Sequence, residues 1–323
     1  MTRAFGIDVS HWNTVDWRVV GTEIDFAIAK SSEGEDYKDD KFPANCQGAY
    51  DAGIPFGAYH YFKAKYYTQF PFPKDGDYSR WPSPEKDLQF QNFVQALKFK
   101  AVHFICLDLE NIGNTGVDGQ WYSVAAQYLA GEMFNYAESR GIPFFIYTRN
   151  TFIKDFAPQI NNWVHRYNSW AAQWTWNAGL VKLSWEDLPP FMPKDMQKPA
   201  YFSTRPTWEL WQFSGDRFHL PGINGAVDLN VYNGTREQLY DFLKYSKPVQ
   251  PPIPEPEPEP EPVTKIVTVA TENGNRLRFR AAPSLTATVL EMLPDGTELI
   301  EVGREGDWVQ VLREGWVHKD WVE

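Results

Sequence analysis

Cysteine is scarce in this sequence, because its 323 residues contain only Cys46 and Cys106, far apart in the chain. Neither lies near a histidine cluster, so the spacing indicates neither a disulfide framework nor a zinc motif. We predict that both are buried free thiols. Long apolar runs are missing too. No segment approaches the roughly 18 apolar residues of a membrane span, and the first residues contain no export signal, so we expect a soluble chain.

Positive charge is also in short supply. The 31 Lys and Arg residues face 42 Asp and Glu residues, which gives a net charge of -11. Such an excess disfavours non-specific attraction to nucleic acid or anionic lipid. We therefore expect neither nucleic acid nor membrane as a partner. Aromatic residues, in contrast, make up 16% of the chain, and hydrophobic residues make up 43%, enough for a sizeable core.

A run of alternating proline and glutamate, PVQPPIPEPEPEPEP at residues 248–262, interrupts the chain. Proline fixes φ and removes a hydrogen-bond donor, and the glutamates repel one another. The run should therefore form an extended spacer that rises about 3 Å per residue. We predict a large domain at residues 1–247 and a small one at residues 263–323, joined by this linker.

Within the large segment, short apolar runs alternate with helical patterns, which is typical of strands joined by crossover helices. Eight strands are predicted, at residues 5–9, 26–30, 55–62, 103–110, 143–148, 169–173, 209–213 and 227–231. This pattern predicts an α/β fold, a modified (β/α) barrel of the TIM type. Residues 174–208 contain five prolines and little periodicity, so we expect long loops there.

Three helices have recognisable ends. Residues 42–52 place apolar side chains on one helical face, and Gly53 follows at the position where helices commonly terminate. Ser83 and Pro84 are predicted to be the N-cap and the first residue of a second helix. Thr235 and Gln238 form a capping box that should open a final helix, extending through Tyr245.

The small segment has a different pattern. Short strands are predicted at residues 267–270, 276–280, 288–292, 298–303, 308–312 and 315–318, separated by Asn-Gly, Ala-Pro-Ser, Asp-Gly and Glu-Gly turns. This arrangement predicts a small antiparallel, all-β barrel.

The sequence HFICLDLEN at residues 103–111 contains a pair of acidic residues. On a strand, Asp108 and Glu110 point to one face, while Ile105, Leu107 and Leu109 point to the other. Two carboxylates at the end of a barrel strand drive one pKa upward, so that one acid stays protonated and the other ionised. Cleavage of a glycosidic bond requires such a pair. The alternative is a solvated pair that caps the following loop.

Two further carboxylates occupy similar positions. Asp8 ends the first strand in FGIDVSHWN, and Asp228 lies on the last barrel strand in AVDLNVYNG. In a barrel, the ends of the strands meet at one mouth, so four carboxylates from three parts of the chain can converge there. Taken singly, each of these residues is also compatible with a turn-capping role.

These motifs, with GAYHYF at 57–62, FIYTRN at 145–150, SWAAQW at 169–174 and LWQFSG at 210–215, resemble glycoside hydrolase family 25, the Chalaropsis-type lysozymes. The resemblance spans nearly all of residues 5–245. It implies hydrolysis of the β-1,4 bond between N-acetylmuramic acid and N-acetylglucosamine. It implies Glu110 as the catalytic acid and Asp108, Asp8 and Asp228 as the other family carboxylates. Four carboxylates are also compatible with a divalent metal, but the residues after Asp108 and Glu110 do not continue into Ca²⁺-loop spacing, so we expect no metal and no cofactor.

Aromatic residues near these motifs are candidates for substrate binding. Tyr59 and Tyr61 share a strand face, and with Tyr147 and Trp170 they would form walls for sugar rings, although core packing is the alternative for each. His60 points away from Tyr59, which indicates a packed rather than a catalytic histidine.

The small segment resembles the bacterial Src-homology-3-type domains of cell-wall enzymes, in Leu277, Arg280, Ala282-Pro283-Ser284, Gly296-Thr297, WVQV at 308–311 and GWV at 315–317. We expect it to bind the cell wall, with a passive spacer domain as the alternative. The expected partner is peptidoglycan, and the expected protein is a monomer that acts on the wall as an extracellular or phage-released enzyme.

Two departures and two rival functions accompany this interpretation. The segments at 63–82 and 174–208 are longer than the family pattern, and they either reshape the groove or pack on themselves. A chitinase-type hydrolase would need Asp at positions 103 and 106, which are His103 and Cys106. A non-catalytic glycan-binding protein is disfavoured because all four carboxylates are present.

Overall fold

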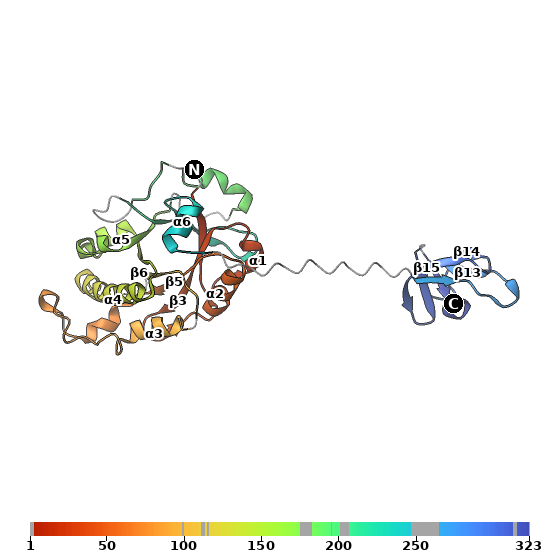
Figure 1. Cartoon of the computed structure of the whole chain (residues 1–323), viewed down its shortest axis with the longest axis horizontal. Coiled ribbons are helices and arrows are strands. Elements are labelled where there is room, and N and C mark those ends of the chain that lie inside the picture. The colour runs from red at the N-terminus through yellow and green to blue at the C-terminus, as the bar shows by residue number, and fades with distance from the viewer. Residues whose placement is uncertain are drawn as a thin grey trace. The chain divides into compact units, whose positions relative to one another are not determined.

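The computed structural model describes residues 3–98, 100–110, 114, 116–174, 183–194, 196–200, 207–246, 265–312 and 315–322. The chain forms two compact units, Met1–Pro248 and Val249–Glu323, which we describe separately (Figure 1). The predicted linker at 248–262 lies outside the described residues, as does part of the predicted loop region at 174–208.

A closed β-barrel forms the centre of the first unit. Among the described residues its sheet has the order β1-β11-β9-β8-β7-β6-β5-β3-β4, and a pairing of β1 with β3 closes it. The strands are β1 (Phe5–Val9), β3 (Phe26–Glu33), β4 (Tyr37–Lys38), β5 (Phe56–Tyr61), β6 (Phe104–Asp108), β7 (Phe144–Thr148), β8 (Asn168–Ala172), β9 (Leu210–Phe218) and β11 (Val227–Tyr232); β2 (Thr14–Val15) pairs separately with β10 (Ile223–Asn224).

The predicted fold class is confirmed, and all eight predicted strands lie in the barrel. Strands β1, β3, β5, β6, β7, β8 and β9 run parallel to one another where they pair. Strand β11 is antiparallel to both of its neighbours, β1 and β9. This reversal is what modifies the regular (β/α) pattern.

The helices of this unit are α1 (Trp17–Val20), α2 (Phe42–Asp51), α3 (Leu88–Ala96), α4 (Gly119–Arg140), α5 (Asn150–Asp155) and α6 (Arg236–Leu243). The predicted end of α2 is confirmed, since Gly53 follows it with a positive φ of 66°. The capping box of Thr235 and Gln238 opens α6 as predicted. That helix ends two residues earlier than expected.

The predicted start of α3 is wrong. Residues 83–86 form a turn, in which the backbone N–H groups of Lys86 and Asp87 donate to the carbonyl of Ser83. The helix begins at Leu88, because the buried Asp87 carboxylate accepts a hydrogen bond of 3.0 Å from the Phe90 backbone and caps it. Tyr67 also donates to this carboxylate, at 2.8 Å, and so anchors the cap from a distant segment.

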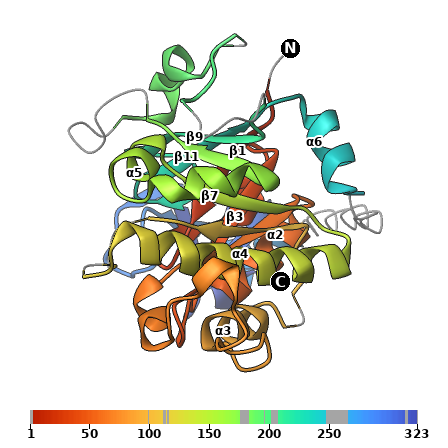
Figure 2. The ribbon, with the colours of Figure 1, turned by 90° about the vertical axis from the view of Figure 1, so that its left-hand side faces the viewer.

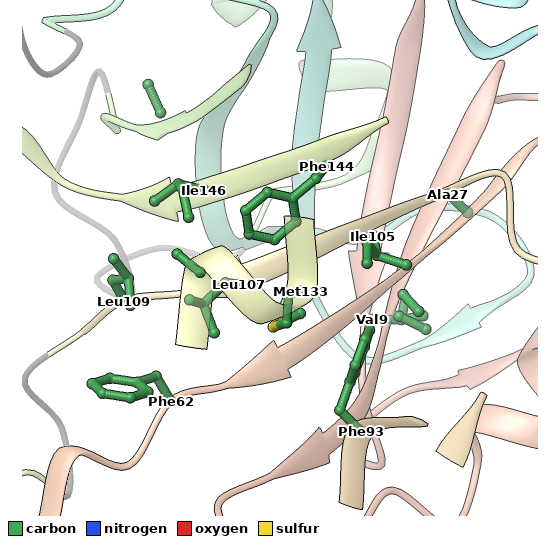
Figure 3. Packing of buried hydrophobic residues seen from close by; sticks show 14 of the residues in the cluster. Val9, Ala27, Phe62, Phe93, Ile105, Leu107, Leu109, Met133, Phe144 and Ile146 are labelled. Carbon is green, nitrogen blue, oxygen red and sulfur yellow. The ribbon is translucent and has the colours of Figure 1, made fainter. Parts of the chain in front are cut away.

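The two faces of β6 carry different parts of the core, as the alternation predicted. Ile105, Leu107 and Leu109 point outward into a cluster that includes Met133 of α4 and Phe93 of α3 (Figure 3). Figure 2 shows the helices around the outside of the strands. Phe104 and Cys106 point into the barrel; Cys106 and Cys46 are buried free thiols, as predicted.

Helix α6 closes the end of the barrel at which the parallel strands begin. Leu239 and Leu243 of this helix share the inner cluster with Phe26, Phe104 and Phe145. Room for these rings comes from Gly6 and Gly57: a Cβ atom there would lie 2.6 Å from the Phe26 ring and 2.3 Å from the Phe104 ring, respectively. The interior is thus filled at this end, which leaves the opposite end for a site.

The segment at 63–82 packs against α4. It contains a short 3-10 helix (Ala64–Gln69), and its Tyr67 and Trp81 rings stack with centroids 5.1 Å apart. Trp81 also stacks on Trp121 of α4. Tyr128 of the same helix contacts the rings of Tyr67 and Trp81. The aromatic residues of this segment therefore extend the outer core cluster of the barrel.

The second unit is a six-stranded antiparallel sheet in the order β12-β15-β16-β17-β13-β14 within its described residues, which confirms the predicted all-β domain. Its strands are β12 (Lys265–Thr268), β13 (Leu277–Arg280), β14 (Val289–Leu293), β15 (Glu298–Glu305), β16 (Trp308–Val311) and β17 (Gly315–His318). A small core of buried aliphatic residues and Phe279 fills it.

Candidate active site

A cavity of about 370 Å³ opens at the C-terminal ends of the parallel strands. All four predicted carboxylates and all four predicted aromatic residues line it: Asp8, Asp108, Glu110, Asp228, Tyr59, Tyr61, Tyr147 and Trp170. It is also lined by Val9, Ser10, His11, Trp12, Asn13, Lys30, Gln212 and Asp216. Segments that are far apart in sequence therefore converge at one mouth, as the strand order requires.

Asp8 and Asp228 lie side by side, because β1 and β11 pair them in register. The Gln212 side-chain amide donates to both carboxylates, at 3.0 Å to Asp8 and 3.2 Å to Asp228. Asn230 donates to Asp8 at 2.6 Å. The backbone N–H of Asp216, whose φ is 46°, donates to Asp228 at 2.7 Å, beside a register shift between β9 and β11. Bulges of this kind often re-aim groups at active sites.

Three aromatic side chains fix the two amides. The Tyr147 hydroxyl and the Trp174 indole N–H donate to the Gln212 side-chain oxygen, at 2.8 and 3.0 Å. The Trp170 indole N–H donates to the Asn230 side-chain oxygen at 2.8 Å. Because the amide oxygens accept these bonds, the amide NH₂ groups must face the carboxylates. Tyr147 and Trp170 thus orient the acidic pair as well as lining the cavity.

Burial sets the ionisation of this pair. It raises the pKa of Asp8 to about 6, against the hydrogen bonds from Gln212 and Asn230, which favour the ionised form. The pKa of Asp228 is raised well above its ordinary value, first by burial and then by the charge of Asp8. Two close carboxylates in a buried site resist simultaneous ionisation.

Asp108 and Glu110 form the second acidic pair. Asp108 ends β6 and is 7% exposed, while Glu110 follows the strand and is half-buried. Burial, and then the charge of Glu110, raise the pKa of Asp108 well above its ordinary value. Burial also raises the pKa of Glu110, although the nearby Arg149 charge opposes the shift. In the described part of the chain, the buried Oδ1 atom of Asp108 has no hydrogen-bond partner.

A buried cation lies beside this pair. Lys30 of β3 is 8% exposed, lines the cavity and forms an ion pair with Glu33. Lys63 pairs with the same carboxylate at 2.7 Å, and the two ammonium groups lie 4.9 and 5.0 Å from the centroid of the Tyr61 ring. The positive charge of Lys30 lowers the pKa values of Asp108 and Glu110 and so opposes the effect of burial.

The rim of the cavity is aromatic and accessible. Trp12 is 81% exposed, and its ring lies 4.5 Å from that of His11. His11 is held by Asp39, whose carboxylate accepts from the His11 backbone at 2.8 Å and lies 3.1 Å from its Nδ1 atom. An exposed ring beside a polar cavity offers a flat face to a sugar.

His60 is packed away from the cavity, as its position on the strand predicted. Its ring bonds to Ser32 at 2.9 Å and to Gln89 at 3.3 Å. Burial lowers the pKa of His60 to about 4, so the imidazole is neutral over the physiological range. It supports the outer layer of the barrel.

Sequence reasoning missed the residues that connect the acids, above all Gln212, Asn230 and Lys30. A signal was available for the first two. Both are polar residues at inward positions of strands that are otherwise buried, and Asn230 follows Asp228 by two residues on the same face. A buried polar side chain needs a partner, so such positions indicate a network.

Comparison with known proteins agrees with this geometry. Residues 7–70 match the family model of glycosyl hydrolases family 25, and residues 275–323 match that of the bacterial SH3 domain. The chain is 28% identical over 246 residues to lysozyme M1 of Streptomyces globisporus, which covers 72% of this chain and 69% of that protein. It is also 28% identical over 257 residues to the uncharacterized protein YegX of Escherichia coli K12, covering 74% of this chain and 72% of YegX.

Two solved structures share the fold. The catalytic domain of endolysin ply40, from bacteriophage P40 of Listeria monocytogenes, superposes with a TM-score of 0.50 at 19% identity, covering 76% of this chain and 98% of that domain. The CTP1L endolysin gives a TM-score of 0.50 at 20% identity, covering 75% and 69%. By these matches the first unit is similar to glycosyl hydrolases family 25, and the second unit is similar to the bacterial SH3 domains.

Proposed function

We propose that this protein is a peptidoglycan hydrolase, a muramidase that cleaves the β-1,4 bond between N-acetylmuramic acid and N-acetylglucosamine. The observation that carries the proposal is the convergence of four carboxylates from β1, β6 and β11 in one aromatic-rimmed cavity. The match to family 25 and the similarity to lysozyme M1 support the same activity.

Glu110 is the proposed general acid. A general acid must hold its proton near the working pH, and burial raises the pKa of Glu110 in that direction. Its half-buried side chain lines the cavity, where it can reach a glycosidic oxygen. Protonation of that oxygen lets the alcohol leave while positive charge develops at the anomeric carbon.

Asp108 is proposed to act through the substrate. The sugar on the reacting side carries a 2-acetamido group, whose carbonyl oxygen can attack the anomeric carbon and form an oxazolinium ion. The Oδ1 atom of Asp108, buried in the cavity wall and without a partner among the described residues, is suited to accept a hydrogen bond from the acetamido N–H. Burial raises the pKa of Asp108, but the positive charge that develops beside it at the anomeric carbon favours its ionised form, which would stabilise that charge. This route retains the anomeric configuration, as would direct attack by Asp108.

Asp8 and Asp228 are proposed to complete the negative wall around the reacting carbon. Their bonds to Gln212 and Asn230 hold them in place, so no reorganisation is needed when charge develops.

Mass spectrometry of digested cell walls tests the proposal, because the new reducing end identifies the bond that is cut. A muramidase leaves N-acetylmuramic acid at that end, whereas N-acetylglucosamine there would refute the bond assignment. Chitin oligomers provide a second arm, since their cleavage at a comparable rate would favour another N-acetylhexosamine polymer. If the first product, observed by NMR, has the inverted configuration, both roles considered for Asp108 are excluded. A trapped ester on Asp108 would exclude only the substrate-assisted role.

A further inference from the structure

A second cavity, of about 690 Å³, lies in the SH3 unit, on the outward face of β13. This strand alternates, with Leu277 and Phe279 buried in the core and Arg276 and Arg278, one just before and one within the strand, exposed. The cavity is lined by Thr271, Glu272, Asn275, Arg276, Leu277, Arg278, Arg280, Leu285, Met292 and Trp308.

Arginine is concentrated in this cavity. Residues 263–323 contain five arginines and carry a net negative charge, with seven basic and ten acidic residues, yet three of the five arginines line this one cavity. Arg280 is 7% exposed and donates to the Ala287 carbonyl at 2.6 Å, so it has a structural role. Neither Arg276 nor Arg278 has an ion pair or a side-chain hydrogen bond within the described part of the unit. Their guanidinium groups are therefore available to a ligand.

Apolar side chains line the cavity beside the arginines, and Thr271, Glu272 and Asn275 make up its polar remainder. Met292 is the cross-strand partner of Arg278 and is 39% exposed, and Leu285, on the loop after β13, is 74% exposed. Trp308 of β16 completes the lining. A site that combines guanidinium groups with exposed aliphatic surface suits an anion attached to a small apolar group.

We propose that this cavity binds the C-terminal carboxylate of a cell-wall peptide, with the arginines on the carboxylate and Leu285 and Met292 on the terminal apolar side chain. Guanidinium groups match the planar carboxylate with two parallel hydrogen bonds. A phosphodiester polymer would also attract arginine, but it has no use for the aliphatic wall. The proposal rests on the proposed function only in naming the wall as the source of the peptide.

The test uses the full chain and a synthetic probe, the peptide Ala-Glu-Lys-Ala, with its C-terminus either free or amidated. Calorimetry should detect binding of the free acid, and amidation should weaken it at least about tenfold, because a charged partner is lost. The double variant Arg276→Ala/Arg278→Ala should weaken binding of the acid by a similar factor. Arg304→Ala removes the same kind of charge from β15, outside the cavity, and should change nothing.

Several outcomes would overturn this assignment. Equal affinity for acid and amide would show that the carboxylate is not recognised. An equal loss in Arg304→Ala would show that only net charge matters. Stronger binding to a purified wall phosphate polymer than to the peptide, with the same dependence on the two arginines, would assign the cavity to phosphodiesters instead. Circular dichroism of each variant would establish that the SH3 unit is folded.

The proposed function can fail independently of this site. Hydrolysis of soluble glycan fragments should be unchanged in the double variant, because neither arginine belongs to the barrel. Co-sedimentation with intact walls should fall in the same variant and not in Arg304→Ala. If the chain cleaves no glycan and yet binds the free-acid peptide through Arg276 and Arg278, the peptide site stands and the hydrolase proposal falls.

Discussion

The two ends of the barrel interior are made by the same strands and have opposite chemistry. At the end where the parallel strands begin, Phe26, Phe104 and Phe145 pack against Leu239 and Leu243 of α6. At the end where they finish, four carboxylates, Gln212 and Lys30 line a cavity, and Asn230 donates to one of these carboxylates from behind. One pleated strand such as β6 therefore contributes Phe104 to a dry core and Asp108 to a polar site, four residues apart.

This difference separates stability from activity. We call the end where the parallel strands begin the lower end and the end where they finish the upper end. Filling the lower end removes apolar surface from water, which stabilises the fold. The upper end destabilises the fold, because burial raises the pKa of its four carboxyl groups, and ionising such groups costs stability; they are Asp8, Asp108, Glu110 and Asp228. Substitutions at the two ends should therefore have different signatures.

The largest effect is expected from Glu110→Gln at the upper end. The amide keeps the shape of the side chain and has no acidic proton to donate, so turnover of cell walls should fall by at least about a hundredfold. The fold should be unaffected or slightly stabilised. Glu132→Gln is the matched control, since burial also raises the pKa of this α4 glutamate, which lies outside the cavity. Near-normal turnover by folded Glu110→Gln would falsify its role as the acid.

The reverse signature is expected from Leu239→Ala at the lower end. Leu239 is 1% exposed in the inner cluster, and its truncation leaves a cavity that should lower the free energy of unfolding by about 2–5 kcal/mol. Activity well below the melting temperature should change by less than about twofold, because Leu239 does not line the cavity that holds the carboxylates. Denaturant titration monitors the first unit, and Leu88→Ala, 53% exposed, serves as the control. A loss of turnover in Leu239→Ala without a matching loss of stability would show that packing at the lower end affects catalysis at the upper end.

The sequence predicted the lower half of this comparison more completely than the upper half. Period-two alternation located the strands and the outward positions of Ile105, Leu107 and Leu109, since hydrophobic burial is read directly from the residue type. Asp108, Glu110, Asp8 and Asp228 could be placed at strand ends for the same reason. Their roles remain predictions.

What the sequence could not give was the pairing of distant polar groups. Gln212 contacts Asp8 across 204 positions of the chain, a contact set by barrel closure. The start of α3 was misplaced for a similar reason. Ser83 has good local capping chemistry, but the cap that forms is Asp87, which is buried beneath Tyr67 from the preceding segment. Tertiary contacts therefore override local signals at both sites.

A smaller effect, on pH dependence, should come from Asp8→Asn. In the folded state the pKa of Asp8 is about 6, against about 3.9 in an unfolded chain, so the folded protein binds this proton more tightly. Its contribution to stability is therefore present below about pH 4 and is lost as the pH rises to 6. Between pH 4 and pH 6, the free energy of unfolding of Asp8→Asn should therefore rise relative to that of the parent protein, by on the order of 3 kcal/mol.

Unfolding curves of both proteins between pH 4 and 7 provide the measurement. His60, whose pKa is lowered to about 4, acts in the opposite direction over the same range, but it is present in both proteins and cancels in the difference. A difference that stays constant with pH would show that Asp8 titrates normally. In that case, ionising Asp8 would not destabilise the folded state, and this part of the difference between the two ends would be wrong.

The smallest effect is expected from Gln212→Leu, which removes the amide that joins the two halves of the acidic wall. Asp8 and Asp228 lose a shared donor, and the Tyr147 hydroxyl and Trp174 indole lose their acceptor. Without the donor, the pKa of Asp8 should rise further, and turnover should fall about tenfold, equivalent to about 1.4 kcal/mol of transition-state stabilisation. The pH dependence of the rate should shift to higher pH as well, in step with the pKa of Asp8.

Gln89→Leu is the matched control, because Gln89 is also a buried amide, bonded to His60 and to the Lys63 backbone away from the cavity. Both variants should lose comparable stability, since each leaves buried polar groups without a partner. Only Gln212→Leu should move the pH–rate profile. If the two variants share one profile and differ from the parent only in stability, Gln212 is a packing residue. The pKa values of Asp8 and Asp228 would then not depend on the Gln212 amide. Its hydrogen bonds to them would stabilise the fold without contributing to catalysis.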